Sequence, residues 1–313
     1  MTDTTLGYLL AATALLFFTT GTLVTRAAST RLDLSLGFLV ATAVNVAFSA
    51  AALLVQWWLR PQDITWDTHA FWLFALAGVF STYLGRFFFY ESVVRFGPAK
   101  ASVFQVSSPL FTALIAWLML GEAISVVVAA GMVLTIGGLV LVSAKPGLKT
   151  RAASTVPPAQ VETGPMARLL QSVFLLGLFS SLAYAIGNVL RGAAIRSWNE
   201  PVLGALVGAV FGLALHLLFS SGRRGLPGRL RDASRSGIAL FALIGVTTIS
   251  AQMCTIAAMR YIPLSVATLV TLCTPILVFP LSHWLYRNQD EITVRTLAGS
   301  ALTLFGIFVI VMR

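Results

Sequence analysis

Residues 71–94 read FWLFALAGVFSTYLGRFFFYESVV, an apolar run long enough to cross a bilayer as one helix. Arg86 lies near the middle of this run. A cation at the centre of a membrane helix costs about 2.5–3.5 kcal/mol on insertion scales, so such a residue normally faces a partner or a water-filled cavity. The stretch therefore predicts a membrane-spanning helix and makes Arg86 a candidate functional residue.

The composition of the whole chain agrees with a membrane setting. Its 313 residues are 58% hydrophobic and 10% charged, whereas soluble domains are about 25% charged. Apolar runs of about 20 residues recur, and a helix satisfies its own backbone groups in lipid. The predicted spans are Leu6–Thr25, Leu36–Trp58, Phe71–Val94, Ala99–Leu120, Ala123–Ser143, Leu169–Ala193, Val202–Ser220, Gly237–Met259, Leu264–Leu285 and Ile292–Met312. We expect an all-α polytopic membrane protein with ten transmembrane helices.

The charge pattern predicts an orientation. Of the 21 Lys and Arg residues, Arg86 lies inside a span and fifteen fall on the side opposite the termini. Five fall on the side of the termini, namely Arg60, Arg191, Arg196, Arg260 and Arg313. Because cytoplasmic loops carry the excess of Lys and Arg, loops 144–167 and 221–236 are predicted to be cytoplasmic and both termini outside. The net charge of +10 thus reflects membrane orientation, and no nucleic-acid partner is expected.

The first residues of the chain and its two cysteines predict neither cleavage nor a metal site. The first five residues contain no Lys or Arg, so the first span is expected to remain as a transmembrane helix rather than be cleaved as a signal peptide. Both cysteines, Cys254 and Cys273, fall inside predicted spans, which predicts neither a disulfide nor a metal site.

The sequence contains an internal repeat. Residues 95–98 (RFGP) recur as residues 260–263 (RYIP), and a proline follows each copy, Pro109 and Pro275. This divides the chain into a five-helix repeat at 1–143, a flexible Pro-rich linker at 144–167, and a second repeat at 168–313. An odd number of spans per repeat inverts the second copy, which is the arrangement of transporters that alternate access around a midplane site.

Residues 98–122, PAKASVFQVSSPLFTALIAWLMLGE, followed by Gly131 and the pair Gly137 and Gly138, resemble the EamA-type transporters of the drug/metabolite transporter superfamily. The resemblance implies ten helices in two inverted repeats and carriage of small metabolites, often outward, including amino acids. It also implies a central cavity lined by the first, third, fourth, sixth, eighth and ninth helices. The chain departs from the pattern at Asp290 and Glu291, where Leu-Gly-Glu is expected, and in having its basic loops opposite the termini.

Six residues are candidates for substrate binding, and each has a structural alternative. Arg86 either anchors an anionic group or bonds neighbouring helices. Tyr83 and Tyr90 lie at i−3 and i+4 from it, where they either form a cavity wall or pack against a helix. The amides of Gln105, Asn188 and Gln252 fall on the helices that line the family's cavity, where they either face solute or hold helices together.

Two titratable residues are candidates for ion coupling. Glu91 is the only acidic residue in a predicted span, but Arg95 at i+4 favours a structural ion pair over coupling. His216 lies near the end of its span and can titrate near neutral pH, although most such residues only bond neighbouring helices.

Pro109 and Pro275 interrupt helical hydrogen bonding and are candidate hinges for gating.

The sequence thus predicts a secondary transporter or facilitator of the inner membrane that exports a small anionic or zwitterionic, amino-acid-like metabolite. It contains no nucleotide loop, nucleophile elbow or metal-ligand cluster, so we expect no enzyme, cofactor or metal. Small residues in the fifth and tenth spans are compatible with a monomer or a weak homodimer. Two alternatives stay open. One is a flippase for a lipid or lipid-linked sugar phosphate, and the other is a non-transporting receptor or scaffold that signals through residues 223–235.

Overall fold

The structure, a computed structural model, describes residues 3–59, 66–120, 126–143, 173–219, 226–286 and 293–311, and every regular element in these ranges is a helix. The first half contains α1 (Asp3–Ser29), α2 (Leu34–Leu59), α3 (Thr68–Ala77), the π-helix η1 (Gly78–Gly85), α4 (Arg86–Phe96), α5 (Pro98–Gln105), α6 (Ser108–Leu120) and α7 (Val126–Ser143). The second half contains α9 (Val173–Ser197), α10 (Pro201–Phe219), α11 (Leu226–Arg231), α12 (Arg235–Tyr261), α13 (Leu264–Leu272), α14 (Thr274–Leu285) and α15 (Val294–Val311). The predicted linker 144–167 and residues 221–225 of the second basic loop lie outside the described ranges.

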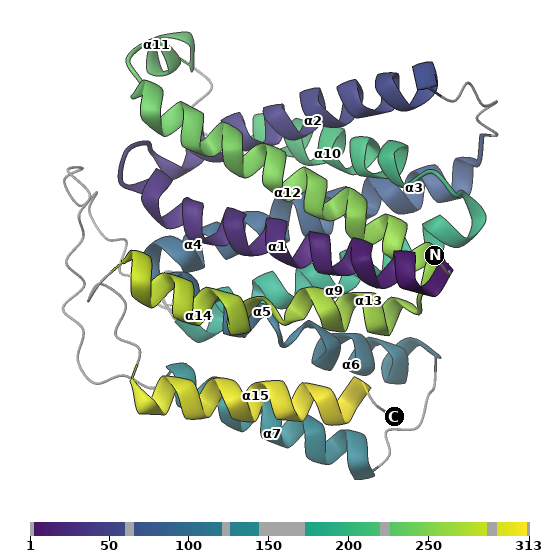
Figure 1. The fold of residues 1–313 in the computed structure, drawn as a ribbon, viewed down its shortest axis with the longest axis vertical. Helices are drawn as coiled ribbons and strands as arrows, with labels where there is room; N and C mark the ends of the chain where they lie inside the picture. Colours follow the sequence, from purple (N-terminus) through teal and green to yellow (C-terminus); the bar gives the residue numbers. More distant parts are fainter. Residues whose placement is uncertain are drawn as a thin grey trace.

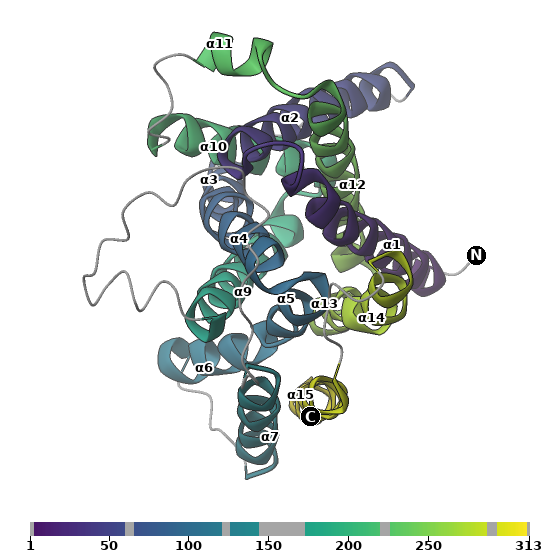
Figure 2. The ribbon, with the colours of Figure 1, turned by 90° about the vertical axis from the view of Figure 1, so that its left-hand side faces the viewer.

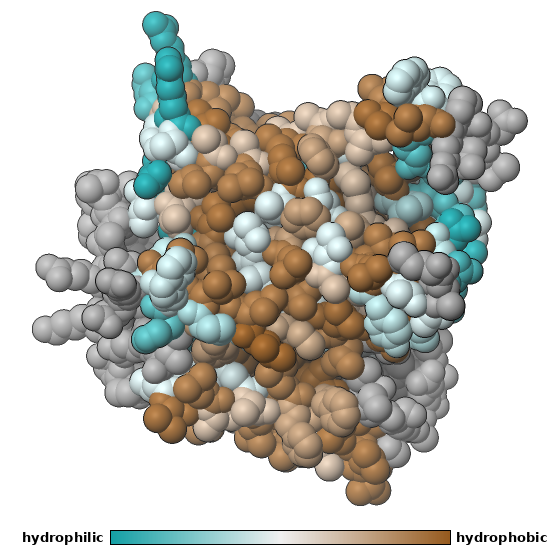
Figure 3. Space-filling view, in the orientation of Figure 1, coloured by the Kyte–Doolittle hydropathy of each residue, from teal (hydrophilic) through white to brown (hydrophobic). Residues whose placement is uncertain are grey.

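The helices lie side by side and cross the molecule in one general direction (Figure 1). Within the described ranges, 7 helical stretches are long and apolar enough to span a membrane, and Val126–Val142 and Val294–Ile310 are shorter apolar helices. Figure 3 shows hydrophobic side chains across the middle of one face and polar ones at its two ends. The prediction of an all-helical, multi-pass membrane protein is confirmed, while the number ten stays a prediction.

Equivalent helices of the two halves make equivalent contacts. The first helix of each half packs along the third span of the other half, α1 along α12 and α9 along α3, η1 and α4. Gly21 accordingly lies against Thr247 and Thr248, and Gly187 lies against Ser81. The fifth spans, α7 and α15, pair with each other at one edge of the bundle (Figure 2). Each half is thus completed by the other.

The third span contains a local change of helix type. Asp67 caps its start by accepting a hydrogen bond from the Ala70 amide at 3.0 Å, which lowers the pKa of this carboxyl group. The chain then passes from α3 into η1, which ends just before Arg86. Its counterpart α12 is one uninterrupted α-helix. A π turn stacks residues i and i+5 rather than i and i+4, so the angle between the side chains of Tyr83 and Arg86 differs from that of a regular α-helix.

The fourth and ninth spans are each divided in two, close to the prolines identified in the sequence. The fourth breaks between α5 and α6, and the ninth breaks at Cys273 between α13 and α14. Pro109 and Pro275 are each the second residue of the helix that follows. A proline is tolerated there because the first amide groups of a helix have no intrahelical acceptor. The predicted interruptions are confirmed, and a hinge motion at them stays a prediction.

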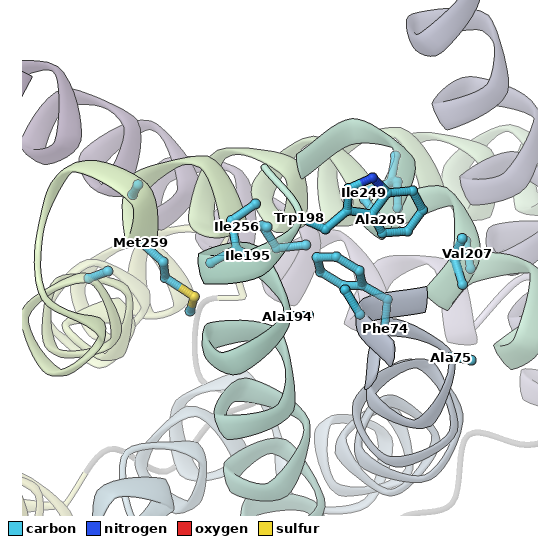
Figure 4. Packing of buried hydrophobic residues seen from close by; sticks show 14 of the residues in the cluster. Phe74, Ala75, Ala194, Ile195, Trp198, Ala205, Val207, Ile249, Ile256 and Met259 are labelled. Carbon is cyan, nitrogen blue, oxygen red and sulfur yellow. The ribbon is translucent and has the colours of Figure 1, made fainter. Parts of the chain in front are cut away.

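A hydrophobic cluster joins the two halves near one end of the bundle (Figure 4). Trp198, which is 2% exposed, follows the end of α9 and packs its ring against Phe74 of α3 at a centroid distance of 6.2 Å. Ile249 and Ile256 of α12 belong to the same cluster. This packing fixes α9 and α12 beside the third span and so positions the polar residues described next.

Candidate functional site

A cavity of about 80 Å³ lies between the two halves. Its lining side chains come from α1, α4, α5, α6, α9, α12, α13 and α14. In terms of predicted spans these are the first, third, fourth, sixth, eighth and ninth, the set that the family resemblance implies. Most of the lining is hydroxyl, amide and aromatic, and it includes two arginines, Arg86 and Arg191.

Arg86 is 2% exposed and begins α4 directly after η1. Its Nη2 donates to Oε1 of Gln252 on α12 at 3.1 Å. The fully buried Asn45 of α2 bonds best with its amide nitrogen donating to the carbonyls of Gly245 and Ala41, at 2.7 and 3.1 Å. In that orientation Asn45 Oδ1 accepts from Nη1 of Arg86. Among the described residues the cation is thus held by two neutral amides, with the phenol of Tyr184 beside it.

The count of basic residues placed the second arginine, Arg191, on the side of the termini, and this placement is wrong. The side chain is 5% exposed inside the bundle. Its Nη2 donates to the hydroxyls of Ser81 and Thr82, the latter at 3.4 Å, and its Nη1 donates to Asn188 Oδ1 at 3.4 Å. The sequence did contain a signal, because residues 184, 188 and 191 share one helical face and carry Tyr, Asn and Arg.

No carboxylate balances these two charges in the part of the chain that the structure describes. The cavity lining contains no Asp or Glu, and the two ion pairs found, Arg95 with Glu91 and Arg229 with Asp33, are partly exposed. Two arginines cost about 5–7 kcal/mol on insertion scales. Four interhelical hydrogen bonds at the membrane average of about 0.6 kcal/mol return only about 2.4 kcal/mol. An arrangement this costly is characteristic of a functional site.

The three predicted amides, Gln105, Asn188 and Gln252, all line the cavity. Two of them have a buried polar atom without a hydrogen-bond partner among the described residues, Oε1 of Gln105 and Nε2 of Gln252. Buried amide atoms are normally satisfied. These atoms are consistent with a site that is completed by a polar ligand or by water.

Neither predicted tyrosine lies among the residues that line the cavity. Tyr83 packs instead against Phe38 and His216, at ring-centroid distances of 6.3 and 6.2 Å. Tyr90 is 2% exposed and packs edge-on against Phe38 at 5.9 Å. The aromatic rings that do line the cavity belong to Phe18, Phe89 and Tyr184.

The two candidate coupling residues also lie outside the lining. Glu91 accepts a hydrogen bond from Nε of Arg95 at 2.8 Å, the structural ion pair that the sequence favoured. His216 is 4% exposed, and its Nε2 is 3.1 Å from the carbonyl oxygen of Ser35. The Glu91 pair therefore lies within α4, whereas His216 joins α10 to α2.

Replacing Glu91 with glutamine is therefore expected to leave transport nearly unchanged. Ion pairs with solvent access contribute about 0.2–1 kcal/mol, so the melting temperature should shift only slightly. The measurement is solute flux into proteoliposomes with and without an imposed pH gradient. Loss of a pH-driven component of flux in Glu91→Gln alone would show that Glu91 takes part in coupling.

Comparison with known proteins assigns the chain to a family. A solved structure, described only as the crystal structure of a protein, aligns over 97% of this chain and 94% of its own with a TM-score of 0.59 and 18% identity, which shows a shared fold. No curated protein matches. The model of the EamA-like transporter family matches twice, over residues 5–144 and 171–312, once in each half. With nearly all of its sequence matched in two copies, the chain belongs to the EamA-like transporter family, within the drug/metabolite transporter superfamily.

Proposed function

We propose that this transporter carries a small solute with an anionic group, either a plain anion or an amino-acid-like zwitterion, and that Arg86 holds that group in the central cavity. The observation that carries the proposal is the burial of Arg86 against two neutral amides. A guanidinium group presents planar, forked donors that match the two oxygens of a carboxylate or phosphate. An anionic solute would thus supply the missing counter-charge.

Alternating access is the proposed mechanism. Each half makes equivalent helix contacts with the other half, and the cavity lies between them. When the two halves exchange conformations, such a site opens to one side and then to the other. Pro109 and Pro275 are the proposed hinges because the fourth and ninth spans are already divided beside them.

The proposed setting is the inner membrane, with both termini outside. Arg229, Arg231 and Arg235 lie on or beside α11, at the end of the bundle opposite the N-terminus (Figure 1). Removing Arg191 from the loops leaves four basic residues on the side of the termini, which strengthens the charge asymmetry. Outward transport is proposed from the resemblance to family members that move metabolites outward.

The test is a thermal-shift screen of the purified protein in detergent against carboxylates, phosphate esters, amino acids, amines and neutral sugars. A ligand at about 100 times its Kd adds roughly 2.7 kcal/mol of stability. Solutes that carry a carboxylate or phosphate should raise the melting temperature, and hits should also be transported by proteoliposomes. Stabilisation and transport confined to amines or neutral sugars would overturn the proposal.

A further inference from the structure

We propose that the solute carries two negative charges, as a dicarboxylate or a phosphomonoester does, and that Arg191 is a second anchor beside Arg86. This inference rests on the proposed function and narrows its solute class. It assigns a binding role to a residue that the count of basic charges placed on the side of the termini.

The two guanidinium groups lie close together. Arg191 donates to Ser81 and Thr82, which precede Arg86 by about one helical turn on the same span. At a rise of about 1.5 Å per residue, the residues that Arg191 contacts lie only ~6–7.5 Å from Arg86 along the axis. Both line the same cavity. One phosphate, or the two carboxylates of a short dicarboxylate, can therefore contact both arginines.

The surroundings of the arginines disfavour a zwitterion. Among the described residues their partners are the hydroxyls of Ser81 and Thr82, the phenol of Tyr184 and three side-chain amides, those of Asn45, Asn188 and Gln252. None of these groups carries a negative charge at neutral pH. Among the described lining residues no carboxylate could receive an ammonium group. An amino acid would place its ammonium beside two cations without a counter-charge, whereas a dianion would neutralise both.

Three threonine hydroxyls of the lining add no further donors for an anionic group. Thr255, Thr268 and Thr271 line the cavity from α12 and α13. Each already donates its hydroxyl to a carbonyl of its own helix, so the oxygen that faces a solute can act as a weak acceptor. This leaves the arginines as the principal donors, with Nε2 of Gln252 as a buried donor that has no partner in the described structure. Charge recognition is thereby concentrated on Arg86 and Arg191.

A purely structural role for Arg191 predicts different behaviour. Gly187, one turn away on α9, already brings this helix within contact of Ser81, since a Cβ at Gly187 would lie 2.5 Å from the Ser81 Cβ. The close approach of α9 to the third span therefore does not depend on the guanidinium group. If Arg191 only bonded helices, its loss would affect all solutes equally.

The test compares matched probes by calorimetric binding to the wild type, Arg191→Gln, Arg191→Lys and Arg86→Gln. Succinate carries two charges, its monoamide succinamate has nearly the same size and one charge, and glycerol 3-phosphate represents the phosphomonoesters. The wild type should bind succinate or glycerol 3-phosphate at least tenfold more tightly than succinamate. Binding of succinate would identify the solute as a dicarboxylate, and binding of glycerol 3-phosphate would identify it as a phosphomonoester. Arg191→Gln should abolish this preference by weakening the binding of the dianions at least tenfold more than that of succinamate, and Arg191→Lys should retain part of the preference. Arg86→Gln should weaken binding of all three.

The wild type alone provides a second measurement that does not depend on a variant folding. The second ionisation of a phosphomonoester has a pKa of about 6. Affinity for glycerol 3-phosphate should therefore rise between pH 5 and pH 7 if the dianion is bound, while succinamate affinity stays level. Equal affinity for one and two charges, or equal loss of both in Arg191→Gln, would overturn this inference and leave the proposed function intact. Failure of all three probes and of every other acid would instead overturn the proposed function.

Discussion

Replacing Gly78 with alanine is expected to prevent the third span from packing against α10. A Cβ at Gly78 would lie 2.4 Å from the carbonyl oxygen of Gly208 and 2.6 Å from its Cα, and these are backbone atoms that no rotamer change can move away. Overpacking that forces backbone shifts typically costs about 1–3 kcal/mol and occasionally more, and a clash with backbone atoms belongs at the upper end of that range. The expected result is a large loss of folded protein, measured as the yield of monodisperse protein and its melting temperature in detergent.

The control for Gly78→Ala is Gly208→Ala, on the other side of the same contact. A Cβ at Gly208 would meet Gly78 Cα at 3.4 Å and the Phe74 carbonyl oxygen at 3.5 Å, which are ordinary contact distances. Alanine also has a higher helix propensity than glycine, by about 1 kcal/mol. Gly208→Ala should therefore fold and melt like the wild type. If Gly78→Ala did so too, the close contact between these helices would be absent from the folded protein.

Replacing Arg86 with alanine is expected to reduce affinity and transport of acid-bearing solutes by at least about 30-fold. Loss of one partner of a buried, hydrogen-bonded charge pair costs about 2–5 kcal/mol, and every 1.4 kcal/mol is a factor of ten. The variant keeps the apolar packing of α4, so it should still be purified in folded form. The measurements are initial rates of flux at several solute concentrations and the thermal shift with saturating solute.

Arg95→Ala is the matched control because Arg95 lies on the same helix but is exposed and paired with Glu91. It should transport within about twofold of the wild type, since partly exposed pairs contribute little. Arg86→Lys should fall between the two variants, because lysine keeps the charge and loses the forked geometry. Similar rates for Arg86→Ala and Arg95→Ala would reduce Arg86 to a helix-bonding residue.

The features that the sequence predicted well are local ones. The helical segments follow from hydropathy, the divided spans follow from Pro109 and Pro275, and the pairing of Glu91 with Arg95 follows from their i,i+4 spacing. Each of these features depends only on one segment of the chain and on the solvent or lipid around it. The lining amides were found because the family resemblance identified the cavity helices.

The missed features depend on contacts between distant segments. The π-helix before Arg86 has no marker in residues 78–85 and alters the face that Tyr83 occupies. Asn45 became relevant only when α2 was seen to bring it to Arg86. Arg191 lies near the end of its predicted span, where hydropathy cannot distinguish a loop cation from a buried one. The polar residues Tyr184, Asn188 and Arg191 on one face of this helix were the stronger signal that Arg191 faces the interior of the bundle.

The divided spans also determine where the site lies along the bundle. At each break the regular ladder of backbone hydrogen bonds is interrupted, and irregular backbone at membrane depth is tolerated only against protein or a water-filled cavity. Gln105, Ser108, Leu272 and Thr274, which flank the two breaks, all line the cavity. The backbone thus fixes the depth of the binding site, and the side chains decide what it accepts. Exchange of lining residues can therefore give a new specificity without relocating the site.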